Sequence, residues 1–164
     1  MKKLFSLFLA LLMVALPLAV GFDGVLTVAS AAEIDYTCGE NATWSLDTST
    51  GELIINGTGA ITKAPWTAYA SVVKKVTIGE GITDLGGGAF NNMYNIKTIS
   101  FPASLERITD SNGLRALETV IIPENSNLRH IEYKSFASNS PWFNSFPDGS
   151  AIKIGPLVYN YKGT

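Results

Sequence analysis

The side chains that most often perform catalysis or hold a metal ion are sparse in this sequence. His130 is the sole histidine, which excludes a site with several histidine ligands and most Ser-His-Asp triads. Because it stands beside Ile131 at the predicted turn of the third coil, we interpret His130 as a solvated loop residue. Acidic residues are scattered without a spacing that would bring two carboxylates onto one site, as glycoside hydrolysis requires. These residues are Asp47, Glu52, Asp84, Glu106, Asp110, Glu118 and Glu124. The sequence therefore predicts no catalytic residue, no metal site and no enzyme.

A run of three glycines, Gly86-Gly87-Gly88, invites comparison with a phosphate-binding loop. Such a loop needs a lysine and a helix N-terminus at a fixed spacing, and neither accompanies this run. We interpret the glycines as a turn between a strand and a loop. No cofactor is predicted here or elsewhere in the chain.

The elements that would position any functional residue are marked by apolar positions that recur along the chain. Two such sets are evident in the sequence: Leu85, Ile108 and Ile131, and Ile78, Phe101 and Ile122. The first set is spaced by 23 and 23 residues, and the second by 23 and 21. Repeats of this length form stacked coils of a solenoid, in which each coil buries its apolar residues only against its neighbours. The sequence thus predicts a mainly β repeat solenoid with about three coils of about 23 residues.

Each repeat opens with a predicted strand that has apolar residues at its first, fourth and sixth positions. The three strands carry Val73, Val76 and Ile78, then Ile96, Ile99 and Phe101, then Leu117, Val120 and Ile122. Pro102 and Pro123 end the second and third strands, because proline cannot donate to a continuing ladder. The second coil has Gly113-Leu114 where the first has Ala89-Phe90. We therefore expect the second coil to be thinner or locally rearranged.

The outward residues of these strands form the most credible functional surface. Side chains alternate between the two faces of a strand, so residues between the inward positions should align in rows across the coils. The candidate binding face consists of Lys75, Thr77, Thr98, Ser100, Thr119 and Ile121, beside a further row of Lys74, Lys97 and Glu118. It could meet a protein or a glycan. The alternative is that these are solvated strand positions, since three coils make a small platform beside the roughly 800 Å² per partner that stable complexes bury.

Residues 1–31 predict an export signal. Lys2-Lys3 is basic, an apolar stretch covers residues 4–20, and Ala29-Ser30-Ala31 offers the small residues that a signal peptidase recognises. Cleavage is expected after Ala31. An uncleaved anchor is the alternative, because the apolar stretch is at the short edge of what spans a bilayer.

Composition narrows the range of partners. The formal net charge is −2, and removal of Lys2, Lys3 and Asp23 with the signal would leave −3. A weakly acidic chain without basic runs lacks the basic surface patch that binds nucleic acid or an anionic membrane. We expect neither partner, beyond the membrane contact of the signal peptide itself.

Cys38 is the only cysteine, so no intramolecular disulfide can form. We interpret it as a small, semi-buried residue, with pairing to another chain as the alternative.

Two hairpins are expected to close the array. Residues 42–47 and 52–57 alternate around a turn rich in Thr, Ser and Gly, which predicts a hairpin that caps the first coil. Residues 152–154 and 157–161 flank Gly155-Pro156 and predict a second hairpin over the last coil. With both ends covered, the array could be soluble by itself.

As a set, these residues resemble the BspA-like leucine-rich repeats of secreted bacterial proteins. The repeats that carry the resemblance are Val76 to Leu85 with Ala89-Phe90, and Ile121-Ile122-Pro123 with Ile131 and Phe136. The segment from Cys38 to Asp47 is similar to a module that often precedes such arrays, and Pro141 to Asn144 with Ile154 to Tyr159 resembles a segment within or after them. The resemblance covers nearly all of residues 38–164. It implies an extracellular or cell-surface protein whose array takes part in adhesion and binding, without catalytic residues to carry over.

The expected layout has four parts. They are a signal peptide at 1–31, an N-terminal β cap and connector at 32–71, leucine-rich repeats at 72–140, and a closing hairpin at 141–164. The expected function is a non-catalytic binding or adhesion module for an extracellular protein or glycan, secreted or located at a bacterial cell surface.

Two alternatives to this function stay open at the level of sequence. A carbohydrate-binding accessory module would need its three tryptophans, Trp44, Trp66 and Trp142, exposed on one side as stacking platforms. Trp66, which follows a proline in the connector, is interpreted first as a packing wedge. The second alternative is a structural spacer that belongs to a larger surface protein.

Overall fold

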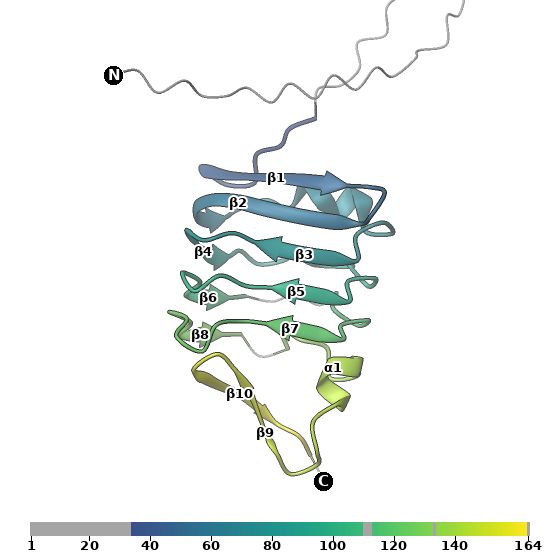
Figure 1. Ribbon diagram of the computed structural model, residues 1–164, viewed down its shortest axis with the longest axis vertical. Coiled ribbons are helices and arrows are strands. Elements are labelled where there is room, and N and C mark those ends of the chain that lie inside the picture. Colours follow the sequence, from purple (N-terminus) through teal and green to yellow (C-terminus); the bar gives the residue numbers. More distant parts are fainter. Residues whose placement is uncertain (1–33, 110–112, 133, 164) are drawn as a thin grey trace, which may run out of the picture. The chain divides into compact units, whose positions relative to one another are not determined.

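The computed structural model describes residues 34–109, 113–132 and 134–163. Within these residues, short strands stack in two columns, one behind the other, along the axis of a solenoid (Figure 1). The predicted export signal at residues 1–31 lies outside the described residues. In the described part of the chain, no helix has the length and apolar composition needed to cross a membrane.

Three coils each contribute one strand to each column. The strands are β3 (Lys75–Ile78) and β4 (Ile82–Leu85) in the first coil, β5 (Thr98–Ser100) and β6 (Arg107–Ile108) in the second, and β7 (Thr119–Ile121) and β8 (His130–Ile131) in the third. β3, β5 and β7 pair in parallel, and so do β4, β6 and β8. The predicted mainly β solenoid of short coils is therefore confirmed.

The second column goes beyond what the repeat pattern predicts. Leu85, Ile108 and Ile131 are expected as single inward residues after a turn, whereas the structure places each at the end of a strand. These strands have only two to four residues, too few to establish a period of two in the sequence. For the same reason the prediction of a loop at His130 is wrong: this residue begins β8, although its side chain is exposed as expected.

The N-terminal hairpin forms as predicted. β1 (Asn41–Asp47) and β2 (Glu52–Ile61) pair antiparallel around a turn that ends at Gly51. Gly51 has a φ of 76°, a conformation that glycine adopts without steric cost. β2 is longer than the predicted strand, and its last residues extend past the hairpin into the second column.

β2 supplies the first rung of both columns. Its first half aligns Leu53 with Val76 of β3, and its last residues align Ile61 with Leu85 of β4, both in parallel. Gly57 lies between the two pairings with a φ of 122°, which allows the strand to bend from one column to the other. The hydrogen-bond ladder therefore begins inside the hairpin that was expected only to cap it.

The apolar core lies between the two columns. Val76, Ile99 and Leu85 are completely buried in the first two coils, whereas Val120 and Ile131 of the third coil are only half-buried. The third coil is less buried because it is the last of the array. In a solenoid each coil depends on the next for burial, and no fourth coil follows β8 within the described residues.

The structure after the third coil is a short helix and a separate hairpin. These elements are α1 (Pro141–Asn144), β9 (Ala151–Ile154) and β10 (Leu157–Tyr161). β9 and β10 pair antiparallel with each other around Gly155, as predicted, and form a two-stranded sheet of their own. Ile152 and Ile154 point into the common core and are buried.

The second coil passes close to the first at the position where the sequence predicts a thinner coil. A Cβ atom on Gly113 would come 1.8 Å from the carbonyl oxygen of Phe90, so only glycine fits this approach. Leu114 is buried beside it. Residues 110–112 lie outside the described residues.

Candidate binding face

The parallel register of β3, β5 and β7 places all six residues of the candidate binding face on one side of the first column. Lys75, Thr98 and Thr119 are paired in one row, and Thr77, Ser100 and Ile121 form the other. Both rows continue onto β2, where Glu52 pairs with Lys75 and Ile54 with Thr77. The short strands thus turn residues far apart in sequence into two continuous lines.

Electrostatic pairing neutralises the N-terminal part of this face. Lys75 Nζ lies 2.9 Å from Glu52 Oε1, and the Thr77 hydroxyl donates to the same oxygen at 3.2 Å. The hydrogen bond from Lys75, followed by that from Thr77, lowers the pKa of the Glu52 carboxyl. In the neighbouring row, Lys97 Nζ lies 2.8 Å from Glu118 Oε1. The face therefore presents little net charge.

The remaining residues of the face offer small hydroxyl groups and one apolar side chain. Thr98 and Ser100 are half-buried, and Thr119 is exposed. Ile121 is 51% exposed at the end of the row, on the third coil. Such a surface can exchange hydrogen bonds and pack against a partner, but it activates no nucleophile. In the described ranges, no group of three or more histidine, cysteine or acidic residues could hold a metal ion.

Several of the acidic residues connect one coil to the next. On the second column Asp84 pairs with Arg107 at 3.4 Å, and Glu106 pairs with Arg129. Glu80 accepts hydrogen bonds from the backbone N–H groups of the next coil's turn, first that of Ala103 at 2.8 Å, and these bonds lower its pKa. Exposed ion pairs of this kind contribute little stability one by one. Their regular use explains why the carboxylates do not converge on one site.

The glycine run forms a tight turn, as predicted. The Gly86 N–H donates to the carbonyl oxygen of Ile61 at 3.1 Å, and a Cβ atom on Gly86 would lie 2.2 Å from that oxygen. Gly88 has a φ of 86°. Both positions thus need glycine for backbone geometry.

The tryptophans are packing residues. Trp44, Trp66 and Trp142 are 5%, 0% and 8% exposed, so they cannot form an exposed stacking platform for a sugar. Trp66 Nε1 donates to the carbonyl oxygen of Ala89 at 2.7 Å, which agrees with its interpretation as a wedge against the first coil. The structure therefore contradicts the alternative of a carbohydrate-binding module that uses these three rings as its sugar-stacking surface.

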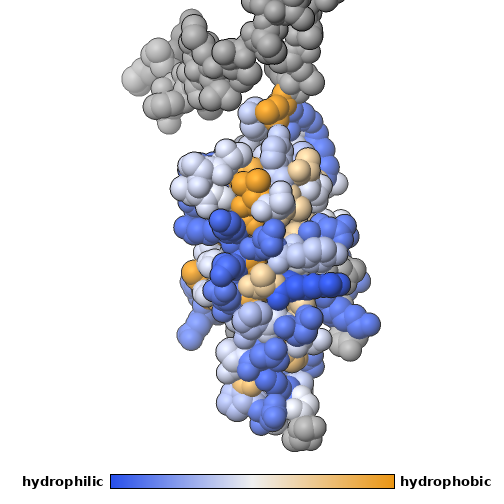
Figure 2. Space-filling view, turned by 90° about the vertical axis from the view of Figure 1, so that its right-hand side faces the viewer, coloured by the Kyte–Doolittle hydropathy of each residue, from blue (hydrophilic) through white to orange (hydrophobic). Residues whose placement is uncertain are grey.

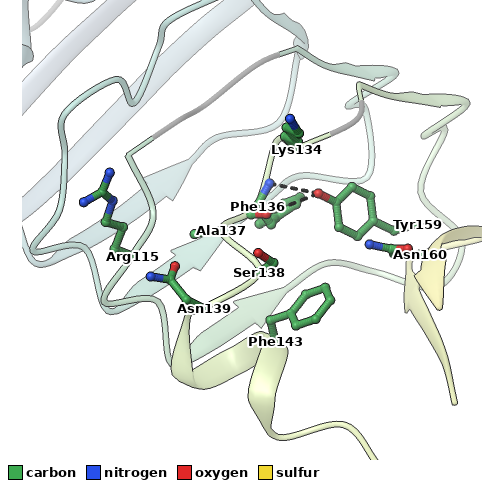
Figure 3. A pocket seen from close by; sticks show the side chains of 9 residues that line it. All are labelled: Arg115, Lys134, Phe136, Ala137, Ser138, Asn139, Phe143, Tyr159 and Asn160. Atoms are coloured by element: carbon green, nitrogen blue, oxygen red, sulfur yellow. Dashed lines mark hydrogen bonds between the residues drawn. The ribbon is translucent and has the colours of Figure 1, made fainter. Parts of the chain in front are cut away.

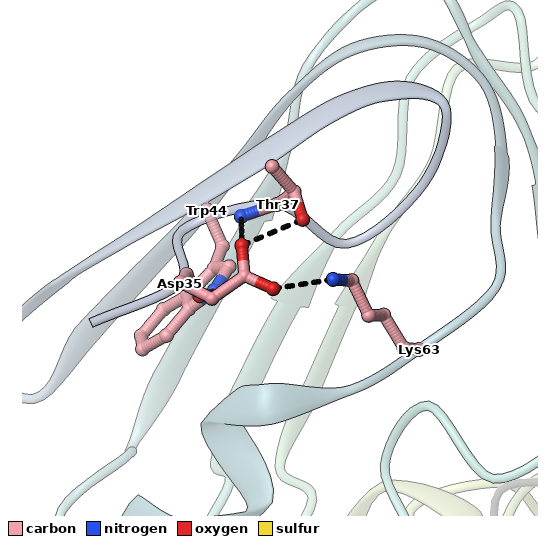
Figure 4. A network of polar contacts seen from close by, with 4 residues as sticks. All are labelled: Asp35, Thr37, Trp44 and Lys63. Carbon is pink, nitrogen blue, oxygen red and sulfur yellow. Dashed lines mark hydrogen bonds and ion pairs between the residues drawn. The ribbon is translucent and has the colours of Figure 1, made fainter. Parts of the chain in front are cut away.

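The segment before β1 is attached to the hairpin by a polar network (Figure 4). Asp35 accepts hydrogen bonds from the backbone and the hydroxyl of Thr37 and pairs with Lys63, while Trp44 Nε1 donates to the Asp35 carbonyl at 3.1 Å. The bond from Lys63 and those from Thr37 hold the pKa of Asp35 well below its usual range. Cys38 lies beneath this network, and burial raises its thiol pKa to about 11. Cys38 is completely buried in the apolar core and not semi-buried as predicted, and the N–H groups of Thr62 and Lys63 donate to its carbonyl oxygen.

A hollow that the sequence did not indicate lies beside the third coil (Figure 3). It has a volume of about 250 Å³ and is lined by Arg115, Lys134, residues 136–139, Phe143, Tyr159 and Asn160. No local motif joins these three segments, so a sequence pattern could not have found them together. Elsewhere, on the side shown in Figure 2, apolar residues gather only in small separate patches among hydrophilic ones.

Comparisons with known proteins give one family and one structural match. The model of the BspA-type leucine-rich repeat region matches residues 60–161, in six copies. A leucine-rich repeat protein from Eubacterium ventriosum, known from a crystal structure, is 18% identical, with 64% of this chain and 42% of that chain covered and a TM-score of 0.42. This chain thus spans less than half the length of that protein. A comparison with curated proteins found no match.

Proposed function

Because the chain belongs to the BspA-type leucine-rich repeat family, we propose that it is a non-catalytic, extracellular binding and adhesion module that acts at a bacterial cell surface. Leucine-rich repeats of this family are protein-interaction modules, typically without enzymatic activity, and the family is associated with bacterial surface proteins. Beyond this family role, we propose that the chain is exported and that it binds an extracellular protein or glycan in adhesion.

The observation that carries the proposal is the register of the first column. Thr98 pairs with Thr119, and Ser100 pairs with Ile121, so outward side chains recur at every rung of a hydrogen-bonded sheet. Binding residues fixed on strands are held more rigidly than residues on loops, which reduces the entropy lost on binding. The hydroxyl rows and the exposed Ile121 suit a protein or glycan surface of mixed polarity.

Export is supported by the basic, apolar and small-residue segments of residues 1–31. A bacterial host that expresses the full-length chain should release a protein whose first residue is Ala32. Mass spectrometry of the released protein tests this. A chain that retains Lys2 and Lys3 and stays with the membrane would contradict export in this form.

The binding face can be tested by adding charge where the structure tolerates it. Thr98→Glu with Thr119→Glu adds two negative charges to the middle and the end of one row. Lys75 is left unchanged, because a glutamate there would face Glu52, its present ion-pair partner, and could disturb the strand. Pull-down of matrix proteins and cell-wall glycans should fail with the double variant and succeed with the natural chain.

The matched control is Thr62→Glu with Ser71→Glu, which adds the same charge at two exposed positions outside the face. It should capture the same partner as the natural chain. Circular dichroism must show that both variants are folded. Equal capture by the face variant and the control would move the binding site away from Thr98 and Thr119.

A structural spacer in a larger surface protein is the second candidate function. It is favoured by the exposure of apolar side chains on the closing hairpin, where Val158 is 50% and Tyr161 is 67% exposed. A further domain could cover them. A spacer would capture no partner in the same pull-down, and this outcome separates the two functions.

A further inference from the structure

The hollow beside the third coil is formed by side chains from three parts of the chain. Arg115 precedes β7, Lys134 and residues 136–139 follow β8, and Tyr159 and Asn160 belong to β10. In Figure 3 these side chains surround a common space at the junction of the last coil and the closing hairpin. None of them belongs to the candidate binding face.

The floor of the hollow is aromatic and rigid. Phe136 is 2% exposed, and its ring meets that of Tyr159 almost at right angles, with 5.4 Å between the centroids. The Tyr159 hydroxyl accepts a hydrogen bond from the Phe136 N–H at 3.1 Å and donates to its carbonyl oxygen at 3.3 Å. Phe143 completes this floor and is also buried.

A β-bulge directs two successive residues into the hollow. Side chains of a regular strand alternate between its faces, so Tyr159 and Asn160 could not both line one space. The pairing of β10 with β9 shifts register between Val158 and Asn160, and such a shift redirects side chains. Together with Ser138 and Asn139, which are exposed, Asn160 gives the hollow a rim of amide and hydroxyl groups.

The charge of the lining is positive. Arg115 and Lys134 line the hollow, and the described residues that line it include no acidic side chain. The Arg115 guanidinium is held over the ring of Tyr94, 4.7 Å from its centroid. The other two arginines, Arg107 and Arg129, pair with carboxylates of a neighbouring coil. Within the described ranges, no carboxylate lies at ion-pair distance from Arg115.

We propose that this hollow binds a sugar residue that carries a carboxylate, as found in acidic glycans. The planar guanidinium of Arg115 suits a carboxylate, which it can bind through two parallel hydrogen bonds. The apolar side of a sugar ring packs on aromatic carbons, here those of the half-buried Tyr159 ring, while its hydroxyls reach Asn139 and Asn160. This site differs in residues and ligand from the strand face and does not depend on the function proposed for that face.

Glucuronic acid is the probe that tests the proposal, with glucose as the matched sugar that lacks the carboxylate. The protein is purified after expression of the full-length chain and titrated by NMR. Glucuronic acid should shift the resonances of Arg115, Asn139 and Asn160, and glucose should bind about tenfold more weakly or not at all, the equivalent of one lost charge-assisted contact. A short peptide with a free C-terminal carboxylate serves as the third probe.

Variants separate recognition of the carboxylate from general effects on the fold. Arg115→Gln should weaken glucuronic acid binding about tenfold, and Asn160→Ala should weaken it less. Arg107→Gln is the control, because it removes an arginine from the second column and should leave binding unchanged. Equal binding of glucose, unchanged binding by Arg115→Gln, or no binding of glucuronic acid would each overturn the proposal. Tighter binding of the peptide at the same residues would overturn the assignment to a sugar.

Discussion

The N-terminal and C-terminal hairpins both cover an end of the solenoid, but they are joined to it by different interactions. At the N-terminal end, β2 is hydrogen-bonded to β1 and continues the ladder into β3 and β4. At the C-terminal end, β9 and β10 are hydrogen-bonded only to each other as strands and contact the third coil mainly through side chains. Figure 1 shows the consequence: β1 and β2 lie alongside the strands of the coils in the same direction across the stack, whereas β9 and β10 lie at an angle to those strands.

Aromatic clusters accompany both hairpins and show the same difference. Trp66 lies between Trp44 and Phe90, with ring centroids 6.2 and 6.4 Å away, and anchors its indole N–H to the first coil. Phe136 lies between Trp142 and Tyr159, at 5.2 and 5.4 Å, beside a hollow. A ladder leaves no space at a rung because the strand spacing is fixed. No strand spacing fixes the distance between the closing hairpin and the third coil, and the hollow lies at this junction.

The largest effect is expected from removing an aromatic anchor at the N-terminal end. Trp66→Ala should lower the free energy of unfolding by about 3 to 5 kcal/mol, because it leaves a cavity in the core and a carbonyl oxygen of Ala89 without its donor. Trp142→Ala should cost less, since the residue is slightly exposed and the closing hairpin can move toward the cavity. Urea denaturation followed by circular dichroism measures both. An equal or larger loss for Trp142→Ala would contradict the idea that the C-terminal end adapts more easily.

Glycines at the two hairpins provide the second test. At Gly57 a Cβ atom would lie 2.0 Å from the backbone oxygen of Asn41, with φ at 122°. Gly57→Ala should therefore destabilise the protein by about 2 to 3 kcal/mol. At Gly155 the nearest atom is the Ser126 hydroxyl at 2.7 Å, and φ is 54°. The hydroxyl can rotate away, so Gly155→Ala should cost about 1 kcal/mol, the strain of the left-handed conformation.

Controls for the glycine test use an open position and a second-site change. A Cβ atom on Gly87 would meet no other atom within 4 Å, so Gly87→Ala should change the free energy of unfolding very little. Ser126→Ala combined with Gly155→Ala should remove the steric part of the cost at the C-terminal hairpin. A Gly155→Ala variant as unstable as Gly57→Ala would show that the closing hairpin is held as rigidly as the first.

The same comparison explains which parts of the structure were predictable from sequence. Inward residues such as Val76, Ile99 and Ile108 were predictable because a solenoid repeats one chemical requirement at one spacing. Both hairpins were predictable because turn residues act locally. The role of Leu53 in the first rung was not, because its strand also pairs antiparallel with β1, and the local hairpin accounts for its pattern without the repeats.

The candidate sites differ in the same way. The rows that contain Thr98 and Ser100 follow from the register of repeated strands, so the sequence could place them side by side. The hollow depends on a bulge at Tyr159, on the position of Arg115 over Tyr94, and on the angle of a hairpin that is not part of the ladder. These are tertiary features that leave no periodic signal in the sequence.

A smaller effect is expected where the closing hairpin is hydrogen-bonded to the third coil. Tyr159→Phe keeps the ring but removes the hydroxyl that meets both backbone groups of Phe136. The free energy of unfolding should fall by about 1 kcal/mol, the usual net value of such a bond. Tyr161→Phe is the control, because this side chain is 67% exposed and should show no loss. If the two variants are equally stable, the hydroxyl does not hold the hairpin in place.

The smallest effect concerns surface charge, and it also differs between the ends. In the folded chain the bond from Lys63 lowers the pKa of Asp35. The folded state therefore favours the ionised carboxylate. The contribution of this carboxylate to stability is complete above the unfolded pKa of Asp35, about 4, and is lost as the pH falls from there toward the lower pKa of the folded state. Asp35→Asn should slightly lower the melting temperature at neutral pH, and the difference from the natural chain should shrink in acid.

Asp148→Asn is the matched change at the C-terminal end, where Asp148 and Lys162 are 3.8 Å apart and the Asp148 side chain is 69% exposed. Because solvent screens so loose a pair, its melting temperature should match that of the natural chain throughout. If Asp148→Asn showed the larger loss, charge would hold the C-terminal end more firmly than the N-terminal end, contrary to the geometry of both pairs.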